Sequence, residues 1–474
     1  MKKKSLHDAG PAFLSDLKAA LGPGAVIPPE ARHLEEPRGI FKGRAAAVLR
    51  PKSTADVAAI VGKCAQARVG VVPISGGTGL VGGQTLEDGA LPVLLSLERM
   101  CAIREVDTFG NTLVAEAGAI LADVRSAAEK AGRQFPLSLA SEGSCRIGGN
   151  LSTNAGGVQV LRYGSARSLC LGIEAVLPDG SVLHGLSRLY KDNTGYDIRD
   201  LLIGAEGTLG VITAAALRLF DIPGKVVTAF LSVSSPRTAL AVFDAVRHEL
   251  GPSLTAFELL HRNGLEFLEE TGLSRSRPFG RIPQWCLLLE AGGGGGQNLA
   301  EQVETVLAGQ VAQDRVEDVL IAQNEAQRAA FWNIRETIPL ANRQIGAISS
   351  HDISLPIDRI PEFIEAADAA IFSIRSDLRT NCFGHIGDGN LHYNVFPPKG
   401  TGKEALASLR PVIKDGIHDL CDKLGGSFSA EHGVGRLKLA ELEKYGDPAK
   451  LAVMRAIKSA LDPQGIMNPG AVLR

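Results

Sequence analysis

Residues 45–83 constrain the fold more than any other part of the chain. An apolar run ends at Leu49, and Ser53 with Asp56 three residues later is typical of the start of a helix. Apolar residues at helical spacing follow, and a second apolar run leads directly into the glycine-rich residues 75–83. This order predicts strand, helix, strand and glycine loop, an arrangement in which an α/β fold can present its backbone to a phosphate group.

The glycine loop itself contains five glycines within eight residues: Gly76, Gly77, Gly79, Gly82 and Gly83. Without Cβ atoms, the backbone can approach a ligand closely, and successive N–H groups can form an anion-binding concavity. The spacing matches neither a Rossmann nor a Walker motif, so nicotinamide and ATP sites are not predicted. A flexible surface loop is also rich in glycine, and this loop taken alone leaves both interpretations open.

Further stretches of the same character follow in a fixed order. Residues 143–157 combine glycines with hydroxyl and amide side chains that can bond ribose, phosphate and ring atoms. Residues 173–184 predict a hairpin turned at an Asp-Gly pair, and residues 201–212 are again rich in glycine. The ordered set resembles the FAD-binding domain of the vanillyl-alcohol oxidase, or PCMH-type, flavoproteins. Some of these proteins attach the flavin to a histidine at the position of Thr78, so the resemblance implies non-covalent FAD here.

The resemblance also implies which residues contact the cofactor. They belong to the glycine-rich stretches and to two later segments: Pro73, Ser75, Gly76, Gly77, Thr78, Gly79, Leu80, Gly143, Ser144, Gly148, Gly149, Asn150, Thr153, Asn154, Gly207, Val211, Glu431 and Asn468.

A second chemical feature lies in residues 382–395. Two β-favouring runs flank residues 387–390, whose composition predicts the turn of a hairpin. His392 and Asn394 share one strand face, and the pairing can bring His385 beside His392. Two imidazoles and the carboxylate of Glu431 would leave open positions on a divalent ion. A histidine in a hairpin is more often structural or solvent-facing, so the spacing alone leaves both interpretations open.

Residues 384–392, followed by 431–433, resemble the C-terminal signature of the D-2-hydroxyglutarate and D-lactate dehydrogenase branch of the same superfamily. The resemblance implies that His385, His392 and Glu431 hold a divalent metal, usually Zn²⁺. It further implies that His432 is the catalytic base and that Asn394 orients the substrate.

Arg335 is the candidate for binding the substrate carboxylate. It lies in a helix predicted over residues 322–338, where an arginine is most often a solvated charge. Its planar guanidinium matches a carboxylate, and the arginine of the similar Trp-x-x-Arg-Glu segment has this role in the family. The hydroxyglutarate enzymes also use a threonine and a lysine where this chain has Pro339 and Ser350. Reaction type is therefore better supported than substrate identity.

Composition limits the remaining possibilities. With 474 residues the chain predicts two or three domains, and a net charge of −2 gives no strong field for nucleic acid. Seven scattered cysteines without a Cys-x-x-Cys pair favour reduced thiols in a cytosol. No signal peptide and no apolar run near the ~20 residues of a membrane span are recognised. The expected location is cytoplasmic, with peripheral membrane contact left open.

The expected fold class is α+β. We expect a PCMH-type FAD-binding domain (1–222, core about 42–221), an antiparallel-sheet substrate or cap domain carrying the metal hairpin (223–424) and a C-terminal segment returning to the flavin (425–474).

The expected function is FAD-dependent oxidation of a D-2-hydroxy acid to the 2-oxo acid, with hydride transfer to flavin N5, a metal-polarised hydroxyl and a histidine base. The expected electron acceptor is an electron-transfer flavoprotein, a quinone or a cytochrome, and a homodimer is left open. The alternatives are an electron-relay subunit of a larger oxidase complex and a flavin oxidase or synthase on the same scaffold.

Overall fold

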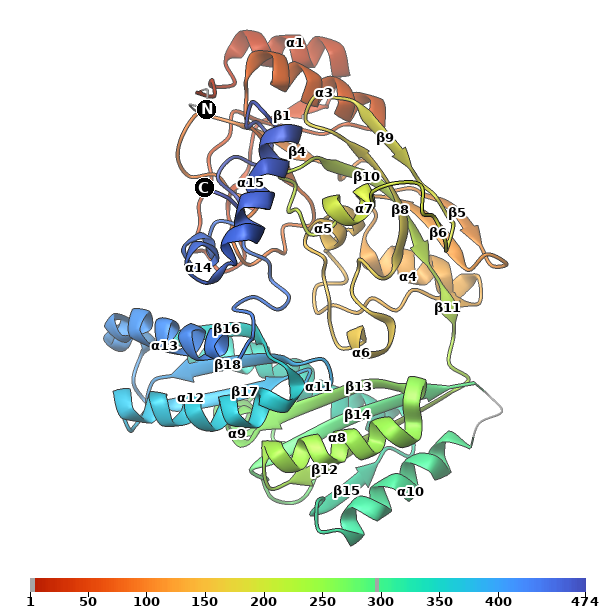
Figure 1. The fold of residues 1–474 in the computed structure, drawn as a ribbon, viewed down its shortest axis with the longest axis vertical. Coiled ribbons are helices and arrows are strands. Elements are labelled where there is room, and N and C mark those ends of the chain that lie inside the picture. The colour runs from red at the N-terminus through yellow and green to blue at the C-terminus, as the bar shows by residue number, and fades with distance from the viewer. Residues whose placement is uncertain (1–4, 295–297) are drawn as a thin grey trace. The chain divides into compact units, whose positions relative to one another are not determined.

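The computed structural model describes residues 5–294 and 298–474. The chain forms two compact units. The first unit comprises Met1–Gly156, Gly164–Ile222 and Glu431–Arg474, and the second comprises Gly157–Tyr163 and Pro223–Ala430. The second unit is therefore largely an insertion between two segments of the first (Figure 1).

The first unit contains a four-stranded sheet in the order β1-β2-β4-β3. Its strands are β1 (Val26–Ile27), β2 (Ala47–Leu49), β4 (Val93–Ser96) and β3 (Val71–Ile74). β2, β4 and β3 are parallel, and α3 (Thr54–Ala67) connects β2 to β3. The Ser53 hydroxyl accepts a hydrogen bond from the backbone N–H of Asp56 (3.1 Å) at the start of α3. The predicted strand, helix, strand and glycine loop is confirmed.

A five-stranded antiparallel sheet has the order β5-β6-β10-β8-β9. Its strands are β5 (Ile103–Asp107), β6 (Thr112–Glu116), β10 (Val211–Arg218), β8 (Cys170–Val176) and β9 (Val182–Gly185). β8 and β9 form the predicted hairpin, and Gly180 turns it at φ +89°. A two-stranded sheet pairs β7 (Arg133–Gln134) with β11 (Phe220–Asp221). The helices are α1 (Pro11–Leu21), α2 (Ala31–Leu34), α4 (Leu121–Lys130), α5 (Ile147–Ser152), α7 (Ile198–Leu202), α14 (Leu439–Tyr445) and α15 (Pro448–Leu461).

The second unit is built on a seven-stranded antiparallel sheet in the order β15-β12-β14-β13-β17-β18-β16. Its strands are β15 (Asp318–Ile321), β12 (Lys225–Val233), β14 (Trp285–Gly293), β13 (Leu254–His261), β17 (Arg379–Gly384), β18 (Asn390–Phe396) and β16 (Ser349–Ser354). Its helices are α6 (Val160–Tyr163), α8 (Pro236–Leu250), η1 (Gly251–Ser253), α9 (Arg262–Glu270), α10 (Leu299–Ala312), α11 (Glu325–Ile345), η2 (Ile357–Arg359), α12 (Ile360–Ile374), η3 (Lys403–Leu409) and α13 (Arg410–Lys423). The antiparallel sheet expected for the substrate or cap domain is confirmed.

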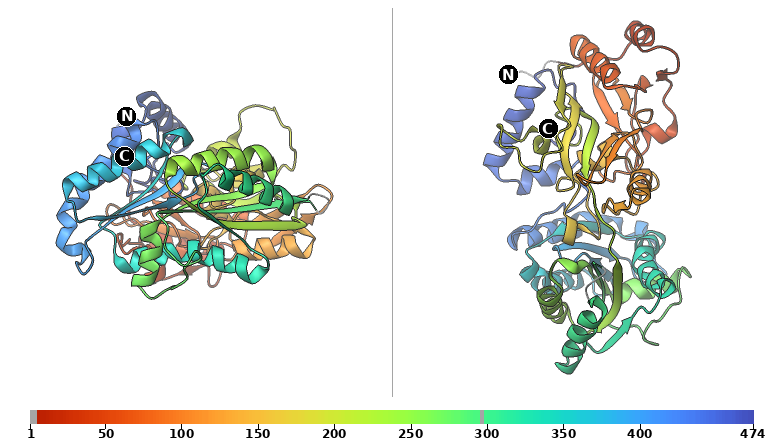
Figure 2. Two further views of the ribbon diagram at one scale, coloured as in Figure 1. Left: turned by 90° about the horizontal axis from the view of Figure 1, so that it is seen from below. Right: turned by 90° about the vertical axis from the view of Figure 1, so that its right-hand side faces the viewer.

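Both faces of this sheet are covered by helices (Figure 2). Successive side chains of a strand point to opposite faces. Leu287 of β14 accordingly packs in one core with Val242 of α8, while Leu288 packs in another core with Ile334 of α11. A strand that is buried on both faces needs apolar side chains on both faces. This explains why residues 285–289 of β14 are all apolar.

Two predicted helices differ from the structure. The helix predicted over residues 322–338 is α11, which continues through Pro339 to Ile345. Proline costs a helix one hydrogen bond, but Ala341 and Asn342 beyond it are buried, and this packing holds the helix together. The sequence also predicts a single helix around residues 404–424, but the structure divides it into η3 and α13, with a non-helical Leu406 inside η3.

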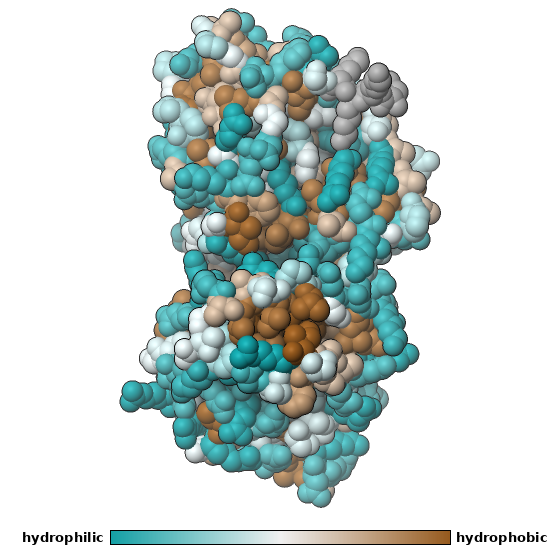
Figure 3. All heavy atoms as spheres, turned by 90° about the vertical axis from the view of Figure 1, so that its left-hand side faces the viewer, coloured by the Kyte–Doolittle hydropathy of each residue, from teal (hydrophilic) through white to brown (hydrophobic). Residues whose placement is uncertain are grey.

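The glycine run at residues 292–296 predicts a flexible loop between a strand and a helix. This prediction is wrong at Gly292 and Gly293, which lie in β14, and residues 295–297 lie outside the described residues. Across the described residues, no helix is both long and apolar enough to cross a membrane. Figure 3 shows one face of the molecule, on which hydrophilic side chains surround smaller apolar patches.

Candidate cofactor and metal sites

The first two glycine-rich stretches lie against each other. A Cβ atom on Gly76 would collide with the carbonyl oxygen of Ser144 and lie 2.8 Å from Cα of Cys145. The Ser75 hydroxyl accepts a hydrogen bond from the backbone N–H of Gly149 (3.1 Å). A Cβ on Gly149 would lie 2.8 Å from the same hydroxyl oxygen. The two stretches can therefore approach this closely only because both positions are glycine.

The third stretch joins the same group through its backbone. The N–H of Gly204 donates to the carbonyl oxygen of Leu151 (3.0 Å), and the N–H of Glu206 donates to that of Ser152 (2.8 Å). A Cβ on Gly207 would lie 2.9 Å from the ring of Pro73. Segments that are far apart in sequence thus form one cradle with thin walls, which we call the glycine cradle.

Asn150 supplies a polar group that suits a ligand. It lies in α5, its residue is 5% exposed, and its amide nitrogen Nδ2 is buried without a hydrogen-bond partner among the described residues. A buried amide donor without a partner is costly, so a ligand oxygen would satisfy it. The glycine walls and this donor fit a polar dinucleotide such as FAD.

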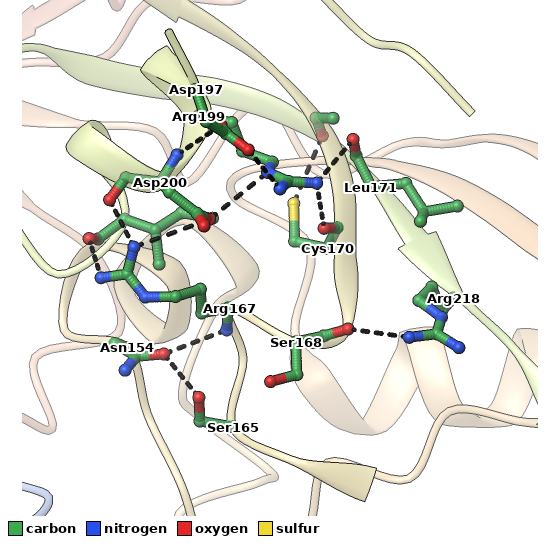
Figure 4. A network of polar contacts seen from close by, with 12 residues as sticks. Asn154, Ser165, Arg167, Ser168, Cys170, Leu171, Asp197, Arg199, Asp200 and Arg218 are labelled. Atoms are coloured by element: carbon green, nitrogen blue, oxygen red, sulfur yellow. Dashed lines mark hydrogen bonds and ion pairs between the residues drawn. The ribbon is translucent and has the colours of Figure 1, made fainter. Parts of the chain in front are cut away.

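Asn154 has a structural explanation (Figure 4). It adopts φ +50°, and its Oδ1 accepts hydrogen bonds from the Ser165 hydroxyl (2.9 Å) and from the backbone N–H of Arg167 (3.0 Å). Arg167 in turn donates to the carbonyl oxygens of Asp200 and Ile203. This network ties the second glycine-rich stretch to α7, and the cofactor contact expected of Asn154 stays a prediction.

The C-terminal segment of the first unit is anchored on the glycine cradle. Asn468 Nδ2 donates to the carbonyl oxygens of Gly83 (2.9 Å) and Glu206 (2.8 Å). The Glu206 carboxylate accepts the backbone N–H groups of Val434 and Gly435, both at 2.8 Å. Burial raises the pKa of Glu206, while these two N–H groups oppose the rise. Glu206 is not among the residues predicted from the sequence.

In the second unit, the predicted hairpin is confirmed. β17 and β18 pair antiparallel, with Phe383 opposite His392, and Gly389 turns the loop at φ +88°. His385 lies directly after β17 and is buried. The His385 and His392 rings meet edge to face, with centroids 5.8 Å apart. The hairpin therefore brings the two imidazoles together, as their spacing predicted.

Beyond Ala430, the last residue of the second unit, the chain continues with Glu431 and His432. The backbone N–H of Ala430 donates to the carbonyl oxygen of Asp352 (3.3 Å), which fixes this point of the chain beside β16. One potential ligand atom from each of His385, His392 and Glu431 lies within 4.8 Å of the other two. Asp352, Glu431 and His432 form a second group by the same measure. Two imidazoles and a carboxylate suit Zn²⁺, so the predicted residues fit a divalent metal.

Arg335, Glu258 and His385 form a buried group of three side chains. Arg335, 6% exposed, donates from Nε to Glu258 Oε2 (2.6 Å), and His385 Nδ1 lies 2.5 Å from Glu258 Oε1. Burial raises the pKa of Glu258, but His385 and Arg335 together lower it, to about 2. Arg335 is predicted from the sequence, whereas Glu258 is not.

Asn394 and Asp352 complete the polar side chains around the hairpin. Asn394 is buried in β18, and its Nδ2 contacts the carbonyl oxygens of His392 (3.3 Å) and Asn381 (3.5 Å). Asp352 on β16 accepts a hydrogen bond from Asn390 Nδ2 (3.0 Å), and its carboxylate lies 3.9 Å from His392 Nδ1. No sequence-based prediction includes Asp352.

Comparisons with known proteins cover nearly the whole chain. A family model of FAD-binding domains matches residues 45–185, and the model of the C-terminal domain of FAD-linked oxidases matches residues 222–472. A probable mitochondrial D-2-hydroxyglutarate dehydrogenase of Oryza sativa subsp. japonica is 36% identical over 471 residues, covering 97% of this chain and 81% of that protein. The D-2-hydroxyglutarate dehydrogenase of Stutzerimonas stutzeri is 34% identical over 466 residues, covering 98% and 99%.

Solved structures share the fold at low sequence identity. An alkyldihydroxyacetonephosphate synthase superimposes with a TM-score of 0.73 at 18% identity, covering 98% of this chain and 86% of the other. p-Cresol methylhydroxylase gives a TM-score of 0.73 at 15% identity, covering 96% and 95%. The expected α+β architecture, with a flavin-binding domain and a large antiparallel sheet, is therefore confirmed.

Proposed function

The chain belongs to the FAD-linked oxidase family, and from this premise we propose that it oxidises a D-2-hydroxy acid to the 2-oxo acid, with D-2-hydroxyglutarate or a D-lactate-like acid as substrate. The observation that carries the proposal is the grouping of His385, His392 and Glu431 in a chain whose relatives are named D-2-hydroxyglutarate dehydrogenases.

FAD would be held by the glycine cradle without a covalent bond. Gly76 and Gly149 keep the walls thin, and Asn150 Nδ2 offers a buried donor to the ligand. Bound FAD supplies an acceptor for the two electrons that leave the substrate as hydride. Thr78, in place of an attaching histidine, makes the cofactor dissociable.

His432 would be the base that accepts the proton of the substrate's α-hydroxyl group. It follows the carboxylate ligand Glu431, so metal binding and proton transfer depend on adjacent residues. A divalent cation such as Zn²⁺, held by His385, His392 and Glu431, supplies Lewis acidity at this place when bound.

Arg335 would bind the α-carboxylate and thereby fix the position of the α-carbon. Its Nε is engaged by Glu258, while the terminal Nη1 and Nη2 atoms form the fork that suits a carboxylate. Asn394 would add an amide contact. Ser350 lies opposite Asn394 in the strand pairing, where a lysine of the hydroxyglutarate enzymes would reach a second carboxylate. A small monocarboxylate substrate is therefore as compatible with this chain as hydroxyglutarate.

The electrons would pass to an electron-transfer flavoprotein, a quinone or a cytochrome. We propose a cytoplasmic protein, with peripheral membrane association and a homodimer left open.

A screen of D- and L-2-hydroxy acids with an artificial dye acceptor tests the function. We expect turnover of D acids by the purified holoprotein, bleaching of the flavin under anaerobic conditions, and reversible loss of activity on chelation with recovery on adding Zn²⁺. The ratio of kcat/KM for D-lactate and D-2-hydroxyglutarate then identifies the substrate class.

The alternatives predict different results. Peroxide formed in step with substrate would identify an oxidase. A protein that binds FAD but neither reduces it with any 2-hydroxy acid nor responds to chelation would instead be an electron-relay subunit or a synthase.

A further inference from the structure

Glu258 is the most buried charged group beside the candidate metal ligands. It lies on β13, is 0% exposed and contacts two functional side chains with its two oxygens. Oε1 lies 2.5 Å from His385 Nδ1, and Oε2 accepts a hydrogen bond from Arg335 Nε at 2.6 Å. We propose that Glu258 is a positioning residue that couples the arginine of the substrate site to the metal ligand His385. This inference rests on the proposed function and extends it.

The first part of the coupling concerns which nitrogen of His385 can bind a cation. A carboxylate at 2.5 Å from Nδ1 requires a proton on that nitrogen, so Nδ1–H donates to Oε1. In neutral imidazole the lone pair then lies on Nε2. A carboxylate that holds a ligating histidine in this way fixes its tautomer and ring orientation and makes it a stronger ligand. Glu258 thus prepares Nε2 of His385 for the metal.

The second part concerns the guanidinium of Arg335. Its Nε is held by Glu258 Oε2, and its Cζ lies 4.8 Å from the centre of the Phe383 ring. The Phe383 ring lies 5.0 Å from the ring of His392. The guanidinium is therefore fixed at its base and on one face, which orients the fork formed by Nη1 and Nη2. A fork fixed in advance loses less conformational entropy when it binds a carboxylate.

A second buried glutamate–arginine pair in the same unit serves as a comparison, because the contacts of its glutamate among the described residues include none of the candidate metal ligands. Glu290 on β14, 6% exposed, accepts hydrogen bonds from Arg328 Nε (2.9 Å), from Trp332 Nε1 (2.7 Å) and from the Thr228 hydroxyl (2.9 Å). Arg328 and Arg335 come from the same helix, α11. The Glu290 pair has the same residue types, sheet and helix, but none of these contacts is a histidine. It therefore provides a matched control.

Zinc binding provides a readout that does not depend on turnover. We compare Glu258→Gln with Glu290→Gln by chelator competition for Zn²⁺ alone, using the FAD-loaded full chain. A glutamine at 258 keeps the shape but replaces one accepting oxygen with an NH₂ donor. It cannot accept from both His385 and Arg335 with separate oxygens. We expect Zn²⁺ affinity to fall about 10- to 100-fold in Glu258→Gln and to stay within about 2-fold of wild type in Glu290→Gln.

A conservative variant and a substrate readout complete the test. Glu258→Asp should recover part of the zinc affinity, because it keeps a carboxylate on a shorter side chain. It also reports on zinc binding if the glutamine variant does not fold. In Glu258→Gln reloaded with saturating Zn²⁺, KM for the acid should still be raised, because a neutral amide holds the Arg335 guanidinium less firmly than a carboxylate does.

The outcomes separate this proposal from the proposed function. Wild-type zinc affinity in folded Glu258→Gln and Glu258→Asp would overturn the coupling, and so would an equal loss in Glu290→Gln. If wild-type protein binds Zn²⁺ in this Glu258-dependent manner but oxidises no 2-hydroxy acid, the function fails while the metal half of the coupling stands.

Discussion

The glycine cradle of the first unit and the hairpin of the second unit are two candidate sites built from different materials. The cradle is formed by backbone, and its key property is the absence of side-chain atoms at Gly76 and Gly149. The hairpin site is formed by ionisable side chains whose donors and acceptors are paired, as in Glu258 with His385. The difference indicates that the cradle is sensitive to added volume, whereas the hairpin site is sensitive to lost charge and proton positions.

The largest expected effect tests the side-chain site. His432→Ala removes the proposed base, and general-base catalysis typically contributes about 10²- to 10⁴-fold. We expect kcat to fall by this factor while the flavin absorbance and the zinc content stay at wild-type levels. Anaerobic stopped-flow reduction of the flavin measures the change. A variant that reduces the flavin at nearly the normal rate would remove His432 from the mechanism.

The next largest effect concerns how the stability of the second unit depends on pH. Burial lowers the pKa of His261 to about 4, with Arg262 adding to the lowering and Asp368 opposing it, against an ordinary value of 6.5. The folded state therefore favours the neutral ring. Protonation of His261 therefore destabilises the folded state. The stability of the unit is unaffected by this residue above pH 6.5, and it decreases as the pH falls from 6.5 toward 4. We expect about 2 kcal/mol of unfolding free energy to be lost between pH 7.5 and pH 5 through this residue.

Denaturant unfolding at both pH values, in wild type and His261→Asn, isolates this contribution. Asparagine can keep the side-chain cap that His261 provides to the N–H of Asn263 at the start of α9. Equal pH dependence in the two proteins would show that the histidine does not titrate as described.

An added methyl group tests the backbone site. In Gly76→Ala the new Cβ collides with the backbone of Ser144, so the two stretches must move apart. Overpacking of this kind typically costs about 1–3 kcal/mol, and we expect a matching loss of stability together with weaker FAD binding. Gly10→Ala is the control in the same unit, because a Cβ there meets no atom within 4 Å. Fluorescence titration of the apoprotein with FAD measures the effect. Wild-type affinity in Gly76→Ala would contradict the role of close backbone approach.

The smallest expected effect is the loss of a helix N-cap, which should lower the unfolding free energy equally in both units. Ser53 caps α3 in the first unit, and Ser235 caps α8 in the second, each accepting a backbone N–H at 3.1 Å. Removing such a cap typically costs about 1 kcal/mol. We expect Ser53→Ala and Ser235→Ala to lower the unfolding free energy by this amount without changing FAD or zinc binding. A change in cofactor affinity in either variant would show that helix position influences its site.

Local patterns allowed much of the fold to be predicted from the sequence. The cap at Ser53, the glycine stretches and the His385–His392 hairpin each depend on residues close together in the chain. Pro339 misled the prediction because tertiary packing of α11 outweighs the local cost of a proline.

The missed site residues have a different physical reason. Glu258 lies 127 residues before His385, and only the order of strands in the sheet brings β13 beside β17. Nothing in the apolar run around Glu258 marks it as the partner of a histidine. Asp352 depends in the same way on the pairing of β16 with β18. Long-range strand order is not encoded in local spacing, so a single sequence does not reveal such partners.

The return of the chain to the first unit has a consequence for biosynthesis. The backbone N–H of Val71 donates to the carbonyl oxygen of Ile466, and the N–H of Asn468 donates to that of Val71, both at 2.8 Å. The edge of the first sheet is thus completed by residues translated almost four hundred positions later. On the ribosome, the inserted second unit is finished before the first can close. Asn468 also bonds the carbonyl oxygens of Gly83 and Glu206, so we expect the glycine cradle to take its final form only after translation through Asn468.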